Sequence, residues 1–158
     1  MINIPKRDSL LIDCFLPDLF LTCNIPRLII GRPRIYLALE INTRKIHSSL
    51  ISFNDPDIET LRKLLTSMPD NGQRENGISS LLLKSIVATP EFDSLFNLLP
   101  LSEIKIFPSK SHFSGLIENV ALSFQRKFSS FKEMGMDDFK HQWELFIDYY
   151  NAKIYAKE

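Results

Sequence analysis

Few residues of this 158-residue sequence could form a nucleophile and its base. Nucleophilic catalysis needs a serine or cysteine beside a base that a third group orients. Ser109 and Ser111 stand next to His112, but no serine lies in a G-x-S-x-G elbow. Serine is also favoured where a helix begins. We therefore interpret this cluster as a helix start, and the sequence predicts no catalytic residue.

Candidate metal and phosphate sites are equally sparse. His141 and Glu144 are three residues apart and can share a helix face, but a zinc site needs further ligands, and no matching pair stands out. The five glycines are too far apart to form a glycine-rich phosphate loop. The sequence therefore predicts no metal site and no cofactor.

The basic residues between positions 27 and 45 form a possible binding surface. They make one strip if the strands around them form a hairpin: Arg27, Arg32, Arg34, Arg44 and Lys45. Such a strip could bind RNA, DNA or an acidic protein, although basic residues also protect a sheet edge from unwanted pairing. Gly31-Arg32-Pro33 resembles the core of the AT-hook, a short motif that binds the DNA minor groove. The apolar segments on both sides favour a turn at this point.

A second possible surface lies on the last helix that the sequence predicts. Trp143 and Tyr150 fall on its apolar stripe and are expected in the core. Tyr149 and Tyr155 fall off the stripe, near acidic residues, and could present an aromatic patch to a protein partner.

Composition sets the broad class of the protein. The 19 basic and 19 acidic residues cancel, so bulk charge gives no reason to expect nucleic-acid binding. The apolar segment Ser9–Ile25 contains Asp13, Pro17 and Asp18, which a membrane span or signal peptide would not favour. We interpret it as core, and expect a cytoplasmic protein without a membrane segment. Cys14 and Cys23 are expected to be buried free thiols, although a disulfide between them is possible.

Short apolar runs predict strands in the N-terminal third and one further strand near position 105. They are Leu10–Phe15, Leu19–Ile25, Leu28–Ile30, Arg34–Ile41, Ile46–Phe53 and Glu103–Phe107. The polar residues 42–45 have the length of a hairpin turn between two of these strands.

Helices are predicted in the remainder of the chain. One is expected to begin at Asp55 as its N-cap, and Ile78–Ala88 is apolar enough to predict a buried helix. A short helix should follow Glu91. Two amphipathic helices, beginning near Ser111 and Asp137, are separated by a short break and predict a C-terminal αα-hairpin.

Together these patterns predict one α+β domain over residues 1–158. We expect a small, mainly antiparallel sheet, with the strand at 103–107, covered by four or five helices. With no active-site motif, the sequence favours a protein-binding module that acts by occupying its partner, as inhibitors and toxin-neutralising immunity proteins do. The alternatives are nucleic-acid binding through the strip from Arg27 to Lys45, and an enzyme of unfamiliar type.

Overall fold

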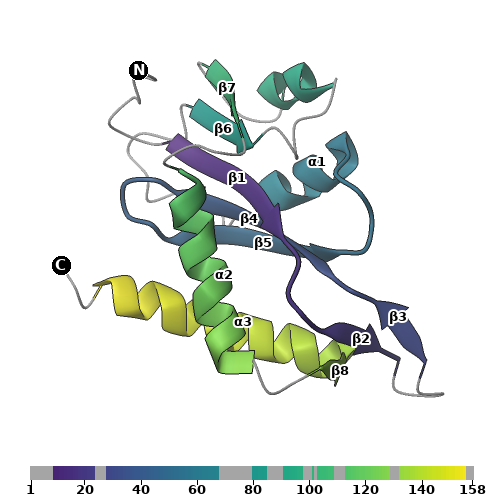
Figure 1. Ribbon diagram of the computed structural model, residues 1–158. Coiled ribbons are helices and arrows are strands. Elements are labelled where there is room, and N and C mark those ends of the chain that lie inside the picture. The colour runs from purple at the N-terminus through teal and green to yellow at the C-terminus, as the bar shows by residue number, and fades with distance from the viewer. Residues whose placement is uncertain are drawn as a thin grey trace.

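A five-stranded mixed sheet lies at the centre of the computed structural model (Figure 1). The structure describes residues 9–23, 28–67, 80–84, 91–97, 101, 103–108, 113–128 and 132–155. The strands, in spatial order, are β5 (Ile46–Ser52), β4 (Arg34–Glu40), β1 (Ser9–Phe15), β6 (Ser80–Lys84) and β7 (Glu103–Phe107). β4 pairs antiparallel with both β5 and β1, whereas β6 pairs parallel with β1 and β7.

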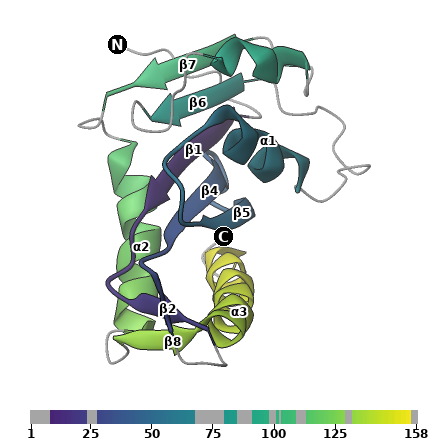
Figure 2. The ribbon, with the colours of Figure 1, turned by 90° about the vertical axis from the view of Figure 1, so that its right-hand side faces the viewer.

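Both faces of this sheet are covered, which explains why β1 is apolar at nearly every position. Leu11 belongs to the core on the side of helices α2 (Ser114–Phe128) and α3 (Met136–Tyr155). Leu10 and Ile12 belong to a second core on the side of α1 (Ile58–Thr66). Figure 2 shows α1 and α2 on opposite sides of the sheet. A central strand with two buried faces reads as a continuous apolar run, not as an alternation.

The predicted turn at residues 42–45 is present and joins β4 to β5. Arg44 has a φ of 61°, an uncommon value for a residue other than glycine. Its amide donates to the Glu40 carbonyl at 2.7 Å, and the Glu40 amide donates to the Lys45 carbonyl at 2.8 Å. These bonds fix the direction in which the Arg44 side chain leaves the turn.

A smaller sheet of three strands continues from the end of β1. Its order is β3 (Ile29–Gly31), β2 (Phe20–Thr22) and β8 (Glu133–Gly135). β8 lies directly before α3 and pairs parallel with β2, so the C-terminal part of the chain completes a sheet that the N-terminal part begins.

The aromatic core joins α2 and α3 to the central sheet. Phe124 of α2 is 1% exposed, and its ring contacts those of Phe139, Trp143 and Phe146 on α3. The Trp143 Nε1–H donates to Ser49 Oγ of β5 at 2.9 Å. The two helices that end the chain therefore hold the sheet together through side chains.

The fold is α+β as predicted, but two parts of the prediction were wrong. The central sheet is mixed and accompanied by a second sheet, so it is not one mainly antiparallel sheet. Its parallel part was missed because Ile78–Ala88 was assigned to a buried helix, whereas residues 80–84 form β6. A short apolar run buried on both faces has no periodicity that separates a strand from a helix.

The described residues contain three α-helices instead of four or five. The segment after Glu91 forms a 3-10 helix, η1 (Phe92–Asn97). The predicted αα-hairpin is replaced by a crossing: β8 precedes α3, and the axes of α2 and α3 cross in Figure 1, whereas Figure 2 shows α2 upright and α3 nearly end-on. The first helix is capped by Asp57, not Asp55.

Candidate functional site

An ion pair between a buried carboxylate and a partly exposed lysine lies near the carboxyl ends of β1 and β6. In open sheets, ligands bind beyond the carboxyl ends of parallel strands, where the strand order reverses. β1 and β6 meet this description, because the next strand of the central sheet after β1 is β4 on one side, and the next strand after β6 is β7 on the other. Asp13 of β1 is 0% exposed, and Lys84 Nζ, at the end of β6, donates to its Oδ2 at 3.0 Å.

The surroundings of Asp13 determine what this pair can do. Burial raises the pKa of Asp13, and the carboxylate of Glu118 on α2 raises it further. Lys84 and the Cys14 amide, which donates to Oδ1 at 2.7 Å, oppose this effect. Burial also raises the pKa of the Cys14 thiol to about 11, so the thiol stays protonated at neutral pH. Because Lys84 holds the second carboxylate oxygen, this pair serves as a tie between β1 and β6.

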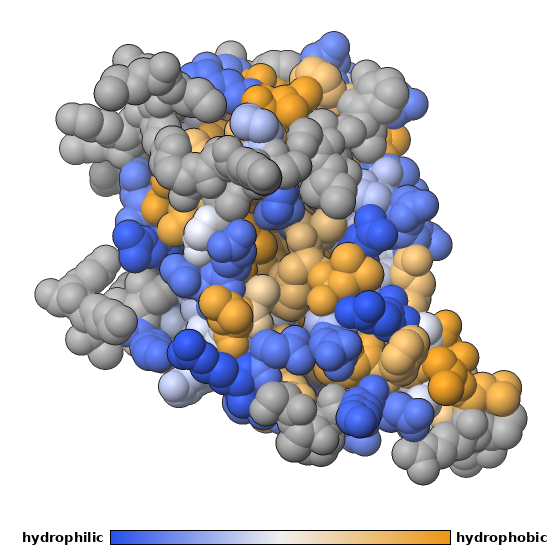
Figure 3. Space-filling model, viewed as in Figure 1, coloured by the Kyte–Doolittle hydropathy of each residue, from blue (hydrophilic) through white to orange (hydrophobic). Residues whose placement is uncertain are grey.

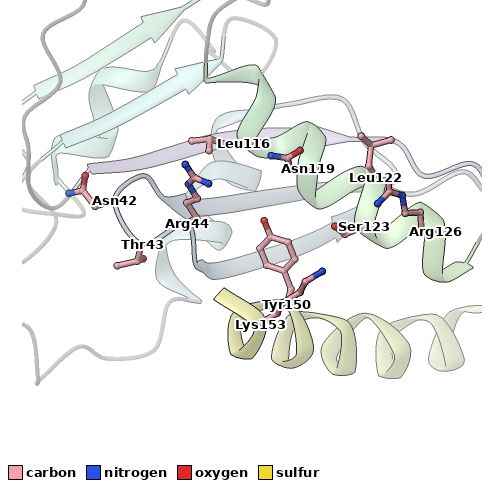
Figure 4. A pocket seen from close by; sticks show the side chains of 10 residues that line it. All are labelled: Asn42, Thr43, Arg44, Leu116, Asn119, Leu122, Ser123, Arg126, Tyr150 and Lys153. Carbon is pink, nitrogen blue, oxygen red and sulfur yellow. The ribbon is translucent and has the colours of Figure 1, made fainter. Parts of the chain in front are cut away.

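A cavity of about 560 Å³ lies between the β4–β5 turn, α2 and α3 (Figure 4). Three basic side chains from three different elements line it: Arg44, Arg126 and Lys153. We call it the basic cavity. Figure 4 shows Arg44 extending from the turn and Tyr150 rising from α3 into the same space.

The basic cavity carries positive charge that no acidic residue in the described part of the chain pairs with. Among the described residues, none of Arg44, Arg126 and Lys153 forms a salt bridge. Burial raises the pKa of Tyr150, whereas Arg44 opposes the rise. The Tyr150 hydroxyl is therefore a hydrogen-bond donor over the whole physiological pH range. Such a set of groups is suited to an anion.

The basic residues named from the sequence lie in two separate places. Arg32 lies 3.8 Å from Asp18 and donates to the Pro17 carbonyl at 3.3 Å, and Arg34 pairs with Asp55 at 3.2 Å. Arg44 and Lys45 follow the opposite end of β4. Arg27 lies outside the described residues.

The two tyrosines named from the sequence lie near the end of α3. Tyr149 is 56% exposed, and Lys127 Nζ lies 5.6 Å from the centre of its ring. Tyr155 is the last residue of α3, and its side chain is outside the part of the chain that the structure describes. Tyr149 thus remains accessible, partly covered by a lysine instead of an acidic group.

A third feature is a group of exposed apolar side chains around β3. Leu28, Ile29 and Ile30 are 59%, 62% and 41% exposed, and Phe53 is 40% exposed. Phe20, on the neighbouring strand β2, is 43% exposed. We call these five residues the apolar corner. Figure 3 shows orange side chains gathered at the lower right, over the β2–β3 region of Figure 1.

Sequence reasoning missed both the ion pair and the basic cavity. The visible signal for the first was Asp13, a carboxylate inside the apolar run Leu10–Phe15, which requires a buried partner. Its partner Lys84 was assigned to a helix. Arg126 and Lys153 gave no signal, because a basic residue near the end of a helix is ordinary.

Two broader observations complete the description of the chain. Within the described residues, no three or more His, Cys, Asp or Glu side chains are grouped so that they could hold a metal ion, and no helix is long and apolar enough to cross a membrane. Neither the protein-family models nor the curated proteins compared with this chain match it.

Proposed function

We propose that this chain is a protein-binding module whose apolar corner docks on an extended segment of a partner protein. The observation that carries the proposal is the exposure of Ile29 and Ile30 of β3 and of Leu28 directly before it. Contiguous apolar surface of this kind is uncommon on monomeric proteins and often marks an interaction site.

The position of β3 indicates how the partner binds. β3 is the outer strand of its sheet, since β2 lies between it and β8. An outer strand presents unpaired amide and carbonyl groups, to which an extended segment can add as a further strand. Main-chain hydrogen bonds would then supply affinity, and the apolar side chains would supply specificity. A protein of this kind acts by occupying its partner, as an inhibitor or a toxin-neutralising immunity protein does.

The local structure supports a docking surface that keeps its shape. Gly31 of β3 has a φ of 146°, and a Cβ built there would lie 3.6 Å from the Phe53 ring. Phe53 follows β5 directly, so this close approach places the ring beside β3. The apolar corner therefore combines residues from three separate segments of the chain.

The experiment compares purifications of the tagged protein from its native cells after nuclease treatment. The test variant is Leu28→Ser with Ile29→Ser, and the matched control is Leu145→Ser, an apolar residue of α3 that is 45% exposed. We expect one stoichiometric protein to co-purify with the wild type and the control, and to be lost from the test variant.

Two results would contradict the proposal. Equal capture by the test variant and the control would mean that the partner binds elsewhere. Material that disappears on nuclease treatment would mean that the chain binds nucleic acid, the alternative that the basic residues suggest.

A further inference from the structure

We infer that the basic cavity binds a phosphorylated small molecule. This inference is independent of the apolar corner, because the cavity is formed by the β4–β5 turn, α2 and α3. Its first support is convergence: Arg44, Arg126 and Lys153 are far apart in sequence and line one hollow. A multiply charged anion placed in this hollow would be attracted by all three positive charges.

The basic residues of the cavity differ from the two arginines at the other end of the hairpin. Arg32 and Arg34 lie beside Asp18 and Asp55, so their charges are largely cancelled. Within the described part of the chain, the cations of the basic cavity have no such partners. The cavity therefore brings three such cations, from three elements, to one hollow of a protein of zero net charge.

The chemistry of the lining favours phosphate among anions. A guanidinium group presents a planar fork of N–H donors that fits two phosphate oxygens, and a lysine adds a mobile point charge. The Tyr150 hydroxyl and the Asn119 and Ser123 side chains add neutral donors from α2 and α3. The bond from the Arg44 amide to the Glu40 carbonyl fixes the backbone from which the Arg44 side chain extends.

The size of the cavity favours a small molecule over a polymer. Its volume of about 560 Å³ falls within the range of about 300–1,000 Å³ typical of small-molecule sites. Leu116 and Leu122 supply an apolar wall for the organic part of a ligand. A nucleic-acid backbone would need a track of cations beyond the cavity, but Arg32 and Arg34 lie at the opposite end of the hairpin and are paired with acids.

The test is a calorimetric titration of the intact protein with inorganic pyrophosphate at low ionic strength. We expect saturable binding by the wild type. Arg126→Gln with Lys153→Gln should weaken it by about tenfold or more, because two charge-assisted contacts are removed. Lys140→Gln, which removes an exposed cation of α3 outside the cavity, should leave the affinity unchanged.

A second variant protects the test against a loss of folding. Arg44→Asn removes the third charge, and asparagine accepts the positive φ of this position better than most residues. It should weaken pyrophosphate binding while the unfolding midpoint of the unliganded protein changes little.

Three results would overturn the inference. The first is that the wild type shows no saturable binding. The second is that the wild type and both cavity variants bind pyrophosphate equally. The third is that a thymidylate oligonucleotide binds more tightly than pyrophosphate and that its affinity rises with the length of the oligonucleotide. The last result would assign the cavity to a nucleic-acid strand.

Discussion

At the scale of single residues, Asp13 is the group whose environment departs furthest from water. A buried carboxylate persists only if hydrogen bonds and an opposite charge replace its hydration. The Cys14 amide and Lys84 do this for Asp13, on its two separate oxygens. Because Lys84 belongs to β6 and Asp13 to β1, the pair also fixes where the parallel part of the sheet ends.

We predict that Lys84→Met lowers the free energy of unfolding at pH 7 by about 3 kcal/mol, because a buried carboxylate is left without its cation. The measurement is urea unfolding followed by circular dichroism. The matched control is Lys105→Met. Lys105 pairs with Glu103 at a partly exposed position on β7, and its removal should cost less than about 1 kcal/mol. Equal losses would show that the Asp13 pair does not stabilise the sheet.

The stability that Lys84→Met loses relative to the wild type should depend on pH. The pKa of Asp13 in the folded protein is raised, so its contribution to stability is present at low pH and is lost as pH rises through that pKa. Removal of Lys84 raises the pKa of Asp13 further, because the hydrogen bond and the positive charge of Lys84 lower it in the wild type. We therefore expect the difference in stability between wild type and Lys84→Met to shrink as the pH falls from 7 toward 4. A difference that grows on acidification would contradict this assignment.

At the scale of elements, the start of α1 shows what local sequence preferences can and cannot predict. The sequence before α1 offers two candidate caps in Asp55-Pro56-Asp57, and either satisfies the local preference. In the structure Asp55 pairs with Arg34 instead of capping the helix. Asp57 then accepts the Thr60 amide at 2.7 Å, which also lowers the pKa of its carboxyl group.

We predict that Asp57→Ala destabilises the protein by about 1 kcal/mol, the usual cost of losing an N-cap, whereas Asp55→Ala costs less than about 0.5 kcal/mol. Thermal unfolding of both variants at neutral pH measures this. The lowered pKa of Asp57 means that its contribution is present at neutral pH and is lost as the pH falls through that pKa. A larger loss of stability in Asp55→Ala than in Asp57→Ala would mean that Asp55 is the N-cap.

The apolar stripe of α2 is the element that the sequence described best. Its three- and four-residue spacing placed Phe124 in the core, and the structure surrounds that ring with aromatic side chains. We predict that Phe124→Ala costs about 3–5 kcal/mol in chemical denaturation. Leu122→Ala, at a position of the same helix that is 55% exposed, should change stability by less than about 0.5 kcal/mol. A small loss at Phe124 would mean that this stripe is not part of the stabilising core.

At the scale of the whole molecule, the sequence predicts local pairing well and distant pairing poorly. The β4–β5 hairpin was visible because its partners are adjacent and its turn is polar. β6 was missed because its neighbours β1 and β7 are contributed by distant segments. The basic cavity was missed for the same reason: only the crossing of α2 and α3 brings Arg126 and Lys153 near Arg44.

Trp143 gives a direct test of whether the molecule unfolds as one unit. It is the single tryptophan, and it joins α3 to Phe124 of α2 and Ser49 of β5. We predict that its fluorescence and the far-ultraviolet circular dichroism show the same urea midpoint, as a single cooperative transition requires. An earlier fluorescence midpoint would show that the α2–α3 side of the sheet separates before the rest unfolds.

The parallel pairing of β2 with β8 has a consequence for the chain during synthesis. Phe20 is paired with Glu133, so one side of β2 has no neighbour until more than a hundred further residues have been added. At typical elongation rates of about 5–20 residues per second, this interval is on the order of ten seconds. Throughout it, the nascent chain displays an apolar strand with an open edge, which is a surface that a chaperone could bind.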